Sequence, residues 1–352
     1  MQGSVLNFSD GALQFHLGRG GEGLGNTSAE FANTGSMVSG LRDEAKIIQK
    51  LTEDFRPQDL YWRQFFPVLG GMPSRLVKVP SFEDDMKVDH RNIMSRVDGT
   101  SPKVITFDAN YSARELLDIW LATVMKPIEG EEAADVVKSR LLNKQALSSK
   151  LNGIMEMSYE MDAAELVTNW ESYETSGNRK ESTGEAGAYY WSDTTNGTPV
   201  LDLQAARAAI SPKGKLANTL ACPLAVLQAL SRHPDFIGNI GKPLNDVEIR
   251  AALKGYGFTN IIITDSVVLN IKTGVYTPAW GSNFCWIGYI ERKVPNKYND
   301  SFGYALGRKG YPKSWSAKES ISQNEFLVTA RCQGLFVTHR SIGYLFKTPL
   351  AS

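Results

Sequence analysis

The sequence predicts an α+β protein of two compact lobes from which extended segments project. Its 352 residues exceed what one hydrophobic core usually organises, which favours two lobes. A proline-free stretch, residues 131–170, predicts a long helix, and the chain after it alternates short helices with strand-like runs. Residues 1–40 are so rich in glycine that they cannot bury a core of their own, and we expect them to be extended.

The composition is that of a folded protein that does not grip nucleic acid through charge. Hydrophobic residues make up 42% and charged residues 22% of the chain, which are ordinary values. Lys and Arg together number 38, as do Asp and Glu, so the formal net charge is zero and specific nucleic-acid recognition is not expected. No apolar run reaches membrane-spanning length, and no signal peptide is apparent. We therefore expect synthesis and folding in a cytoplasm, without a membrane partner.

The N-terminal arm, residues 1–40, holds nine of the 31 glycines. Phe15, Leu17 and Phe31 are nevertheless spread through it. Apolar side chains on an extended segment favour docking on a neighbouring subunit, and a disordered tail is the alternative. A short amphipathic helix is predicted after the arm, over residues 40–55.

A protruding finger is predicted for residues 75–107. Residues 75–79 and 103–107 have strand-like composition, and residues 81–100 between them carry five acidic and three basic side chains, a net charge of −2. A structureless loop of that length is uncommon in a compact domain, which favours a two-stranded finger. Since an isolated hairpin is only marginally stable in water, the finger needs a surface to lie on, and this favours an assembly.

The predicted long helix of residues 131–170 contains one glycine and no proline. Apolar side chains at steps of three or four mark one buried stripe along it: Leu151, Met155, Tyr159, Ala163, Leu166 and Trp170. A helix of this length would span roughly 60 Å and cross the whole subunit. Two shorter helices with a break near Ser148 are the alternative. Three acidic side chains of the helix are expected on a solvated face: Glu156, Glu160 and Glu165.

The last half of the chain predicts a small mixed sheet flanked by helices. Helices are expected over residues 203–210, 223–232, with Pro223 as the first helical residue, and 247–253. Strands are expected over residues 261–263, 284–290, 325–331 and 335–338.

A search for catalytic, cofactor and metal motifs yields no candidate residue. Gly18, Gly20 and Gly23 match the dinucleotide spacing GxGxxG, but no apolar strand precedes them and no helix opens after them. The four histidines form neither HExxH nor HxH. Cys222 and His233 flank one predicted helix and would lie roughly 16 Å apart, too far for a nucleophile and its base.

The three cysteines show no metal-binding or disulfide spacing. They are Cys222, Cys285 and Cys332, and no CxxC pair occurs among them. Buried, reduced thiols are the simplest interpretation. We therefore expect no enzyme activity, no cofactor and no metal, although a site dispersed over distant loops would leave no trace in the linear sequence.

Ordered segments along nearly the whole chain resemble one family. They are SRLVKVPSF through YSARELL in residues 74–116, the helical stretch 131–170, WSDTTNGTPVLDLQAARAAI from Trp191, LANTLACPLAVLQALSRHPDFIG, IIITDSVVLN, AWGSNFCWIGYI and the terminal GYLFKTPLAS. Together and in this order, the segments resemble HK97-fold major capsid proteins of tailed bacteriophages, and the lambda-E-like branch most. Each piece alone is weakly specific, so the order carries the resemblance.

The resemblance implies an HK97-like capsid fold and a division of the chain. Residues 1–56 would form the N-terminal arm with its short helix, and residues 57–115 the region of the extended E-loop β-hairpin. Residues 116–200 would form the P-domain with the spine helix, and residues 201–330 an α/β A-domain. Residues 331–352 would return as C-terminal strands to the A/P body.

The resemblance also implies a function in assembly. Such subunits form hexamers and pentamers of an icosahedral capsid around phage double-stranded DNA, in a virion assembled in the bacterial host cytoplasm. Portal and scaffolding proteins are the implied partners, and a cement protein is left open. An encapsulin-like nanocompartment shell is the alternative, followed by a hydrolase with a dispersed site.

Intersubunit contacts are expected from the arm and the finger. The arm would dock through Phe15, Leu17 and Phe31. The finger would form ion pairs through its charged side chains: Glu83, Asp84, Asp85, Arg91 and Arg96. Some members of the family cross-link a lysine to an asparagine. Lys87 does not align with that lysine, so this chemistry is not carried over.

Overall fold

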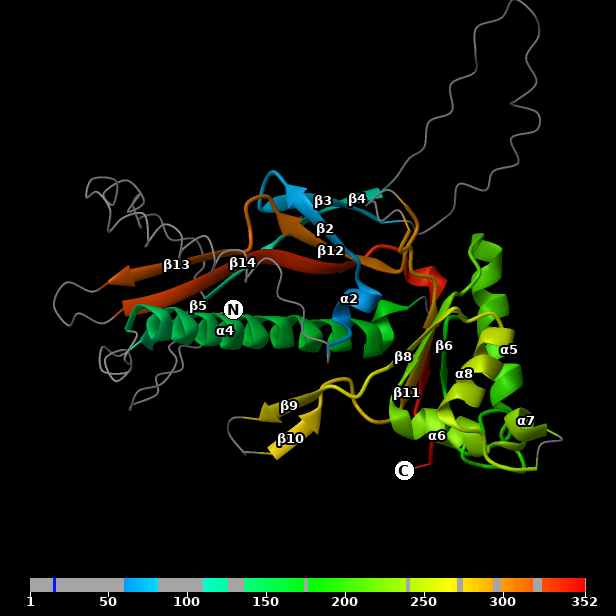
Figure 1. Ribbon diagram of the computed structural model, residues 1–352. Helices are drawn as coiled ribbons and strands as arrows, with labels where there is room; N and C mark the ends of the chain where they lie inside the picture. The colour runs from blue at the N-terminus through cyan, green and yellow to red at the C-terminus, as the bar shows by residue number, and fades with distance from the viewer. Residues whose placement is uncertain are drawn as a thin grey trace, which may run out of the picture.

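The chain folds into two bodies joined at an angle, one long and one compact (Figure 1). The computed structural model describes residues 15–16, 60–81, 110–125, 136–173, 177–238, 241–270, 275–293, 299–318 and 325–351. The predicted α+β class is confirmed, because a long helix and two sheets make up these bodies. The predicted helix of residues 40–55 and the glycine motif at Gly18 lie outside the described residues.

The long body is a sheet laid along one helix, α4 (Val136–Thr168). The helix runs without a break at Ser148, so the prediction of a single long helix is confirmed and the alternative is wrong. Its 33 residues span about 50 Å. The strands are β1 (Phe15–His16), β2 (Val68–Met72), β5 (Leu117–Met125), β12 (Gly303–Arg308), β13 (Lys313–Lys318) and β14 (Glu325–Val337). Their order is β1-β5-β14-β12-β2, and β13 pairs with β14 beside β12.

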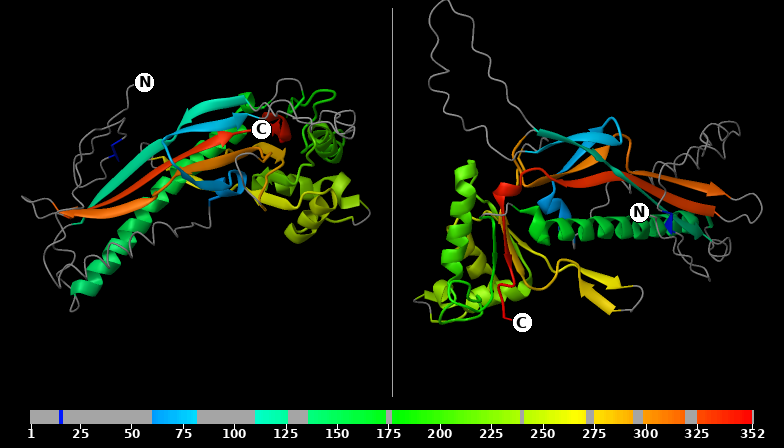
Figure 2. Two further views of the ribbon diagram at one scale, coloured as in Figure 1. Left: turned by 90° about the horizontal axis from the view of Figure 1, so that it is seen from above. Right: turned by 180° about the vertical axis from the view of Figure 1, so that it is seen from behind.

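The core of the long body lies between α4 and the sheet. Seen from above, the strands run obliquely over the helix (Figure 2). Leu151, Met155, Tyr159 and Ala163 are buried there, as the predicted stripe requires. Val167 continues the stripe in place of Leu166, which is half-buried. A single turn, α2 (Trp62–Phe65), inserts three buried aromatic side chains into this core: Trp62, Phe65 and the following Phe66.

A two-stranded hairpin base packs on the long sheet. β3 (Leu76–Ser81) pairs antiparallel with β4 (Asn110–Glu115), from Leu76↔Glu115 at one end to Ser81↔Asn110 at the other. The buried side chains of Val77 and Val79 pack against β12 through Tyr304 and Leu306. The strand predicted at residues 75–79 is thereby confirmed. The strand predicted at residues 103–107 lies outside the described residues.

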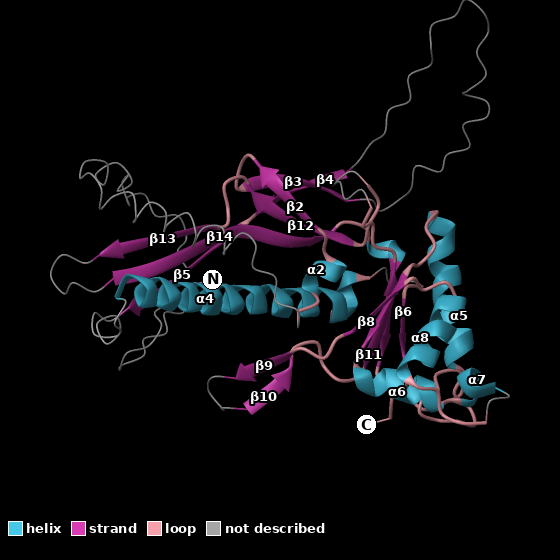
Figure 3. Cartoon of the chain, in the orientation of Figure 1, coloured by secondary structure: helices cyan, strands magenta, loops and turns pink. Residues whose placement is uncertain are grey.

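The compact body is a five-stranded mixed sheet with helices (Figure 3). Its strands are β6 (Arg179–Glu181), β7 (Thr219–Cys222), β8 (Asn260–Ile263), β11 (Phe284–Gly288) and β15 (Gly343–Lys347), in the order β6-β15-β11-β7-β8. Its helices are α5 (Pro199–Ile210), α6 (Leu224–Arg232), α7 (Pro234–Ile237) and α8 (Asp246–Gly255). β7 and β11 are buried along their whole length, which places them at the centre of the core.

The helices predicted for this body are all present, with shifted ends. α5 begins at Pro199, earlier than expected, because proline is accommodated in the first turn of a helix. Pro223 precedes the first turn of α6 as its N-cap and is not the first helical residue. Asn245 and Glu248 close a capping box that fixes the start of α8. Among the described residues, 3-10 turns also occur at Trp170–Ser172, Ser211–Lys213 and Arg340–Ile342.

The strands predicted at 325–331 and 335–338 are one strand, β14, and they lie in the long sheet. The prediction of two separate strands was wrong because Gly334 does not interrupt the pairing of β14 with its neighbouring strands. A Cβ on Gly334 would lie 2.7 Å from the ring of Phe336, so the glycine makes room for that ring within a continuous strand. A division of the chain at 330 falls inside this strand, and β12, before it, also belongs to the long sheet.

A second hairpin projects from the junction of the two bodies, below α4 in the view of Figure 1. β9 (Val267–Asn270) and β10 (Val275–Pro278) pair only with each other among the described residues. Three side chains of the hairpin are exposed: Val267, Val275 and Tyr276. This hairpin was not predicted from the sequence.

Candidate functional site

The long helix carries a buried polar face that the sequence analysis did not predict. Five polar residues recur at every fourth position and all are at most 2% exposed: Lys144, Ser148, Asn152, Glu156 and Glu160. Residues four apart lie on the same side of a helix, so the five side chains form one row. We call this row the polar ladder. It lies beside the apolar stripe, and side chains of β14, of α2 and of Ser266, which precedes β9, pair with it.

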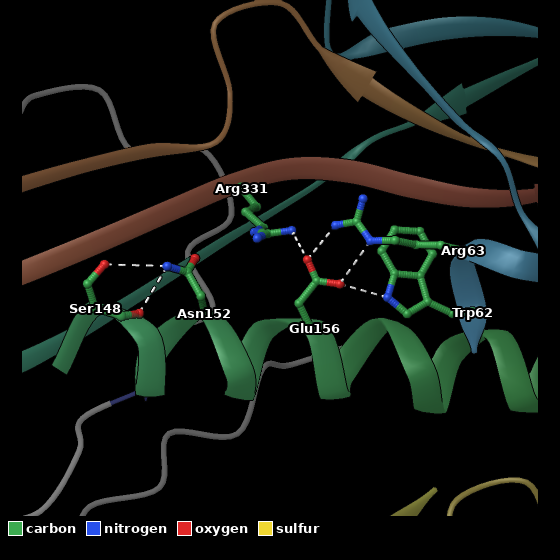
Figure 4. A network of polar contacts seen from close by, with 6 residues as sticks. All are labelled: Trp62, Arg63, Ser148, Asn152, Glu156 and Arg331. Carbon is green, nitrogen blue, oxygen red and sulfur yellow. Dashed lines mark hydrogen bonds and ion pairs between the residues drawn. The ribbon is translucent and has the colours of Figure 1, made fainter. Parts of the chain in front are cut away.

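Glu156 is the centre of the ladder (Figure 4). Arg63 of α2 and Arg331 of β14 each place a guanidinium nitrogen 2.5 Å from its Oε1. Trp62 Nε1 donates to Oε2 at 2.8 Å. One carboxylate therefore joins three elements that are far apart in the sequence. Because one negative charge faces two positive charges, the cluster has an excess of positive charge.

Glu160, one turn further along, holds a second set of groups. Its carboxylate accepts hydrogen bonds from the backbone N–H of Trp62 at 2.7 Å and from Ser266 Oγ at 2.8 Å. The backbone N–H of Tyr61 and the indole N–H of Trp280 also donate to it. The start of α2 and the chain on both sides of the β9–β10 hairpin are thereby fixed to α4. Buried carboxylates require such donors, because an unpaired one is very costly.

At the other end of the ladder, Lys144 Nζ lies 2.9 Å from Glu325 Oε1. Both side chains are nearly fully buried. Glu325 is the first residue of β14, and Arg331, six residues later, reaches Glu156. Two ion pairs along the same strand and helix therefore fix their relative register, since sliding either element would leave charges buried without partners.

The expectation of solvated carboxylates on this helix is wrong for Glu156 and Glu160, and Glu165 is exposed as expected. The partners of the two buried residues lie more than 90 positions away, so no local pattern reveals them. The recurrence of polar residues at every fourth position, beside the apolar stripe, was a signal in the sequence that could have revealed this buried face. They indicate a helix that is enclosed on more than one side.

A small cavity opens next to the Glu156 cluster. Its volume is about 200 Å³. Ten residues line it: Arg63, Val68, Gly70, Gly307, Arg308, Tyr311, Pro312, Arg331, Cys332 and Gln333. Among the described residues, Arg331 Nε and Nη2 and Gln333 Nε2 are buried and have no hydrogen-bond partner. These three donor atoms are enclosed by the protein, and the residues that carry them line the cavity.

The cysteines are buried and free, as expected. Burial raises the pKa of Cys332 to about 12 and, together with the neighbouring Cys222 thiol, raises that of Cys285. These groups are therefore thiols at neutral pH and poor nucleophiles. His233 caps α7, where its Nδ1 accepts from the backbone N–H of Asp235 at 3.2 Å, so its interpretation as a helix-end histidine is confirmed.

The described part of the chain contains no cluster of three or more side chains suited to hold a metal ion. In the same residues, no helix combines the length and apolar character needed to cross a membrane.

Most of the predicted contact residues lie outside the described residues. These are Leu17 and Phe31 of the arm and Glu83, Asp84, Asp85, Arg91 and Arg96 of the finger. Phe15 is described only as backbone in β1, which pairs with Leu121 of β5. The contacts of all eight residues stay predictions.

Comparison with known proteins agrees with this architecture. A phage-related protein from Bordetella bronchiseptica RB50 is 18% identical, over 86% of this chain and 96% of that protein, with a TM-score of 0.65. A protein described as a prophage capsid protein of Escherichia coli CFT073 is 13% identical, over 88% of this chain and 98% of its own, with a TM-score of 0.53. No family model and no curated protein matches the sequence.

Because the sequence identities are low, the likeness to these two structures establishes the fold and nothing more. The chain has the HK97-like capsid fold, as the sequence predicted. After the division that the resemblance implies, we call α4 the spine helix, the long sheet with α4 the P-domain, and the five-stranded sheet with its helices the A-domain.

Proposed function

We propose that the chain is the structural subunit of a phage capsid, which assembles with copies of itself into a closed shell. The observation that carries the proposal is the HK97-like fold over 86% of the chain, shared with a phage-related protein of nearly the same extent. The prophage capsid protein with the same fold supports it.

The shape of the subunit supports the same conclusion. The β9–β10 hairpin stands away from both bodies and exposes Val267, Val275 and Tyr276 at 51%, 56% and 67%. Two-stranded hairpins are marginally stable without a surface to pack on, and exposed apolar groups on such a projection are typical of contact sites. Neighbouring copies in a shell would supply that surface.

The finer features of the proposal follow from the resemblance of the sequence. The subunits would form hexamers and pentamers of an icosahedral capsid that encloses phage double-stranded DNA in the virion, and they would assemble in the host cytoplasm. Portal and scaffolding proteins would be the partners, and a cement protein a further one. A net charge of zero supports a shell that contains DNA without binding it tightly.

The extended segments would make the reciprocal contacts. Residues 1–56 would act as the arm, and residues 57–115 would form the E-loop region, whose base is the β3–β4 pair. Rings and shells require interfaces in which one patch of a subunit meets a different patch of the next. An arm and a finger of the kind that the resemblance implies would suit such interfaces. In this proposal the protein has no catalytic role, and the polar ladder serves to hold the P-domain together.

Electron microscopy of the purified protein, with the light-scattering mass of the same chromatographic peak, tests the proposal. We expect rings or closed shells, formed by the chain alone or on co-expression with its neighbouring phage genes. A particle that stays monomeric or dimeric under both conditions would overturn the proposal. Shells that contain protein cargo and no nucleic acid, when isolated from infected or induced cells, would indicate a nanocompartment instead.

A further inference from the structure

A second pocket lies at the junction of the two bodies and shares no residue with the cavity beside Glu156. Its volume is about 260 Å³. Seven residues line it: Gln64, Arg250, Lys254, Thr259, Asn260, Ile261 and Arg292. Gln64 belongs to α2 of the long body, and Arg292 lies on the connection from β11 to β12, which crosses from one body to the other. The remaining lining comes from α8, from β8 and from the turn between them.

The lining of this junction pocket carries three positive charges and no acidic side chain. The cations are Arg250, Lys254 and Arg292. Asp246, one turn before Arg250 on α8, takes up part of this charge, because Arg250 Nε donates to its Oδ2 at 2.9 Å. Lys254 and Arg292 have no ion pair among the described residues. The pocket therefore keeps an excess of positive charge that an anion would complement.

The guanidinium of Arg292 is bonded to uncharged acceptors. Nη2 donates to the backbone carbonyl of Gln64 at 3.0 Å, and Nη1 donates to Asn260 Oδ1 at 3.3 Å. Glu291, the adjacent acid, accepts instead from the Tyr289 hydroxyl at 2.8 Å. Burial lowers the pKa of Arg292, because its positive charge is partly removed from water. Arg292 thus connects the two bodies and lacks a negative partner among the described residues.

The cationic groups of the junction pocket are accessible from solution. Lys254 and Arg292 are exposed, and Arg250 is half-buried. Nη1 of Arg250 donates to the carbonyl of Ile261 at 3.3 Å, which holds the guanidinium against β8. In a partly enclosed pocket, an anion is attracted more strongly than on a flat surface, because less water screens the charges.

We propose that the junction pocket binds a phosphate group between α8 and Arg292. Arginine binds phosphate oxygens through its fork of donors, and lysine binds them as a point charge. A tetrahedral phosphate presents oxygens in several directions, which suits cations that approach from two segments of the chain. A carboxylate has two oxygens in one plane, and a single guanidinium satisfies it. The site belongs to the single subunit, so the inference goes beyond the proposed function and does not rest on it.

Isothermal titration calorimetry of the unassembled full-length protein tests the site directly. The probes are sodium phosphate and sodium acetate, each titrated at constant ionic strength set with sodium chloride. We expect saturable binding of phosphate at one site per chain and at least about tenfold weaker binding of acetate. The absence of saturable phosphate binding would overturn the proposal, and so would acetate that binds as tightly as phosphate.

One variant and a matched control locate the binding. Lys254→Glu reverses a charge of the pocket at an exposed side chain, so the fold should be retained, which circular dichroism checks. It should weaken phosphate binding about tenfold or more. Lys242→Glu makes the same charge change at an exposed lysine of the same body, outside the lining, and should leave binding unchanged. An equal loss in both variants would show a general charge effect and overturn the site.

Urea unfolding provides a second readout of the same site. A ligand that binds only the folded state raises the urea midpoint. Phosphate also stabilises proteins in general, because it is excluded from their surface, and this effect acts equally on wild type and variant. We therefore expect phosphate to raise the midpoint of the wild type by more than that of Lys254→Glu. Equal increases in the two proteins would contradict binding in the pocket.

A fluorescent double-stranded oligonucleotide distinguishes two sources of the phosphate group. If the phosphodiester of nucleic acid is the ligand, the oligonucleotide should bind, inorganic phosphate should displace it, and Lys254→Glu should weaken it. If phosphate binds and the oligonucleotide does not, the ligand is a free phosphate and the site stands. If inorganic phosphate and the oligonucleotide both fail to bind, the proposal is overturned.

Discussion

Single buried residues in this protein hold together segments that are distant in sequence. Glu156 is fully buried and joins Trp62, Arg63 and Arg331. Such a cluster adds little net stability compared with an apolar core, because its charges had to leave water. The cluster contributes specificity to the fold. Removal of one partner leaves the other charges buried without compensation, so the cluster is satisfied in only one arrangement of α2, α4 and β14.

Replacement Glu156→Gln should destabilise the subunit by about 3–5 kcal/mol, the usual cost of breaking a buried ion pair. The amide keeps the shape of the side chain and leaves two arginines without a counter-charge. Urea unfolding followed by tryptophan fluorescence measures the change. Glu165→Gln on the exposed side of the same helix is the control and should stay within about 0.5 kcal/mol. Equal effects of the two substitutions would contradict a special role for Glu156.

Asp162 should make the subunit less stable as pH rises above 3.8. Desolvation, and then repulsion from Glu165, raise its pKa above the usual 3.8 in the folded state. The folded state therefore binds the proton more tightly than the unfolded state, and stability is lost as pH rises from 3.8 through the folded pKa. Asp162→Asn should stabilise the protein at pH 7, measured by urea midpoints. A lower midpoint for this variant at pH 7 would contradict the assignment.

At the residue scale, the sequence predicted apolar burial well and polar burial poorly. Leu151, Met155 and Tyr159 are recognisable as a stripe because hydrophobic periodicity is a local property. The burial of Glu156 depends on Arg63 and Arg331, which the fold brings together from both sides of the sequence. The cavity beside Arg331 was likewise not predictable, since strands β2, β12 and β14 all contribute to it.

At the scale of elements, long patterned segments and the apolar strands β3, β8 and β11 were predicted, whereas strands rich in glycine or polar residues were not. α4 and the helices of the A-domain have clear periodicity or caps. β12 reads GYALGR and β13 reads KSWSAK, and neither sequence looks like a strand because glycine or polar residues dominate it. Both become strands through pairing with β14, whose 13 residues provide the template.

The β9–β10 hairpin yields a prediction about assembly. Val275→Ser with Tyr276→Ser should leave the urea midpoint of the isolated subunit nearly unchanged, because both side chains are more than half exposed. The yield of particles should fall, because the apolar contact that covers the hairpin is lost. Thr277→Ser is the matched control on the same strand. Full yield from the double variant, measured by sedimentation, would show that the hairpin does not form a contact.

At the scale of the whole molecule, the proposed arm and finger are the segments expected to contact neighbouring subunits. Deletion of residues 1–35 should leave a soluble fold, because the described core residues of both bodies all come after residue 60 and, of the described elements, the deletion removes the two-residue strand β1 alone. Shell formation or shell stability should be impaired. Circular dichroism checks the fold, and electron microscopy with heating checks the shells. Normal shells of equal stability would contradict the role of the arm.

The position of β15 has a consequence for the synthesis of the protein. β15 lies between β6 and β11, so it joins the two parts of the five-stranded sheet, and it follows every other strand of both sheets in the chain. While the ribosome is still translating, the A-domain therefore has a gap beside β11, and β6 has no partner strand. The nascent chain cannot present a finished A-domain to another subunit before residue 347 has emerged. In the proposed shell, association through the A-domain would therefore follow completion of the chain.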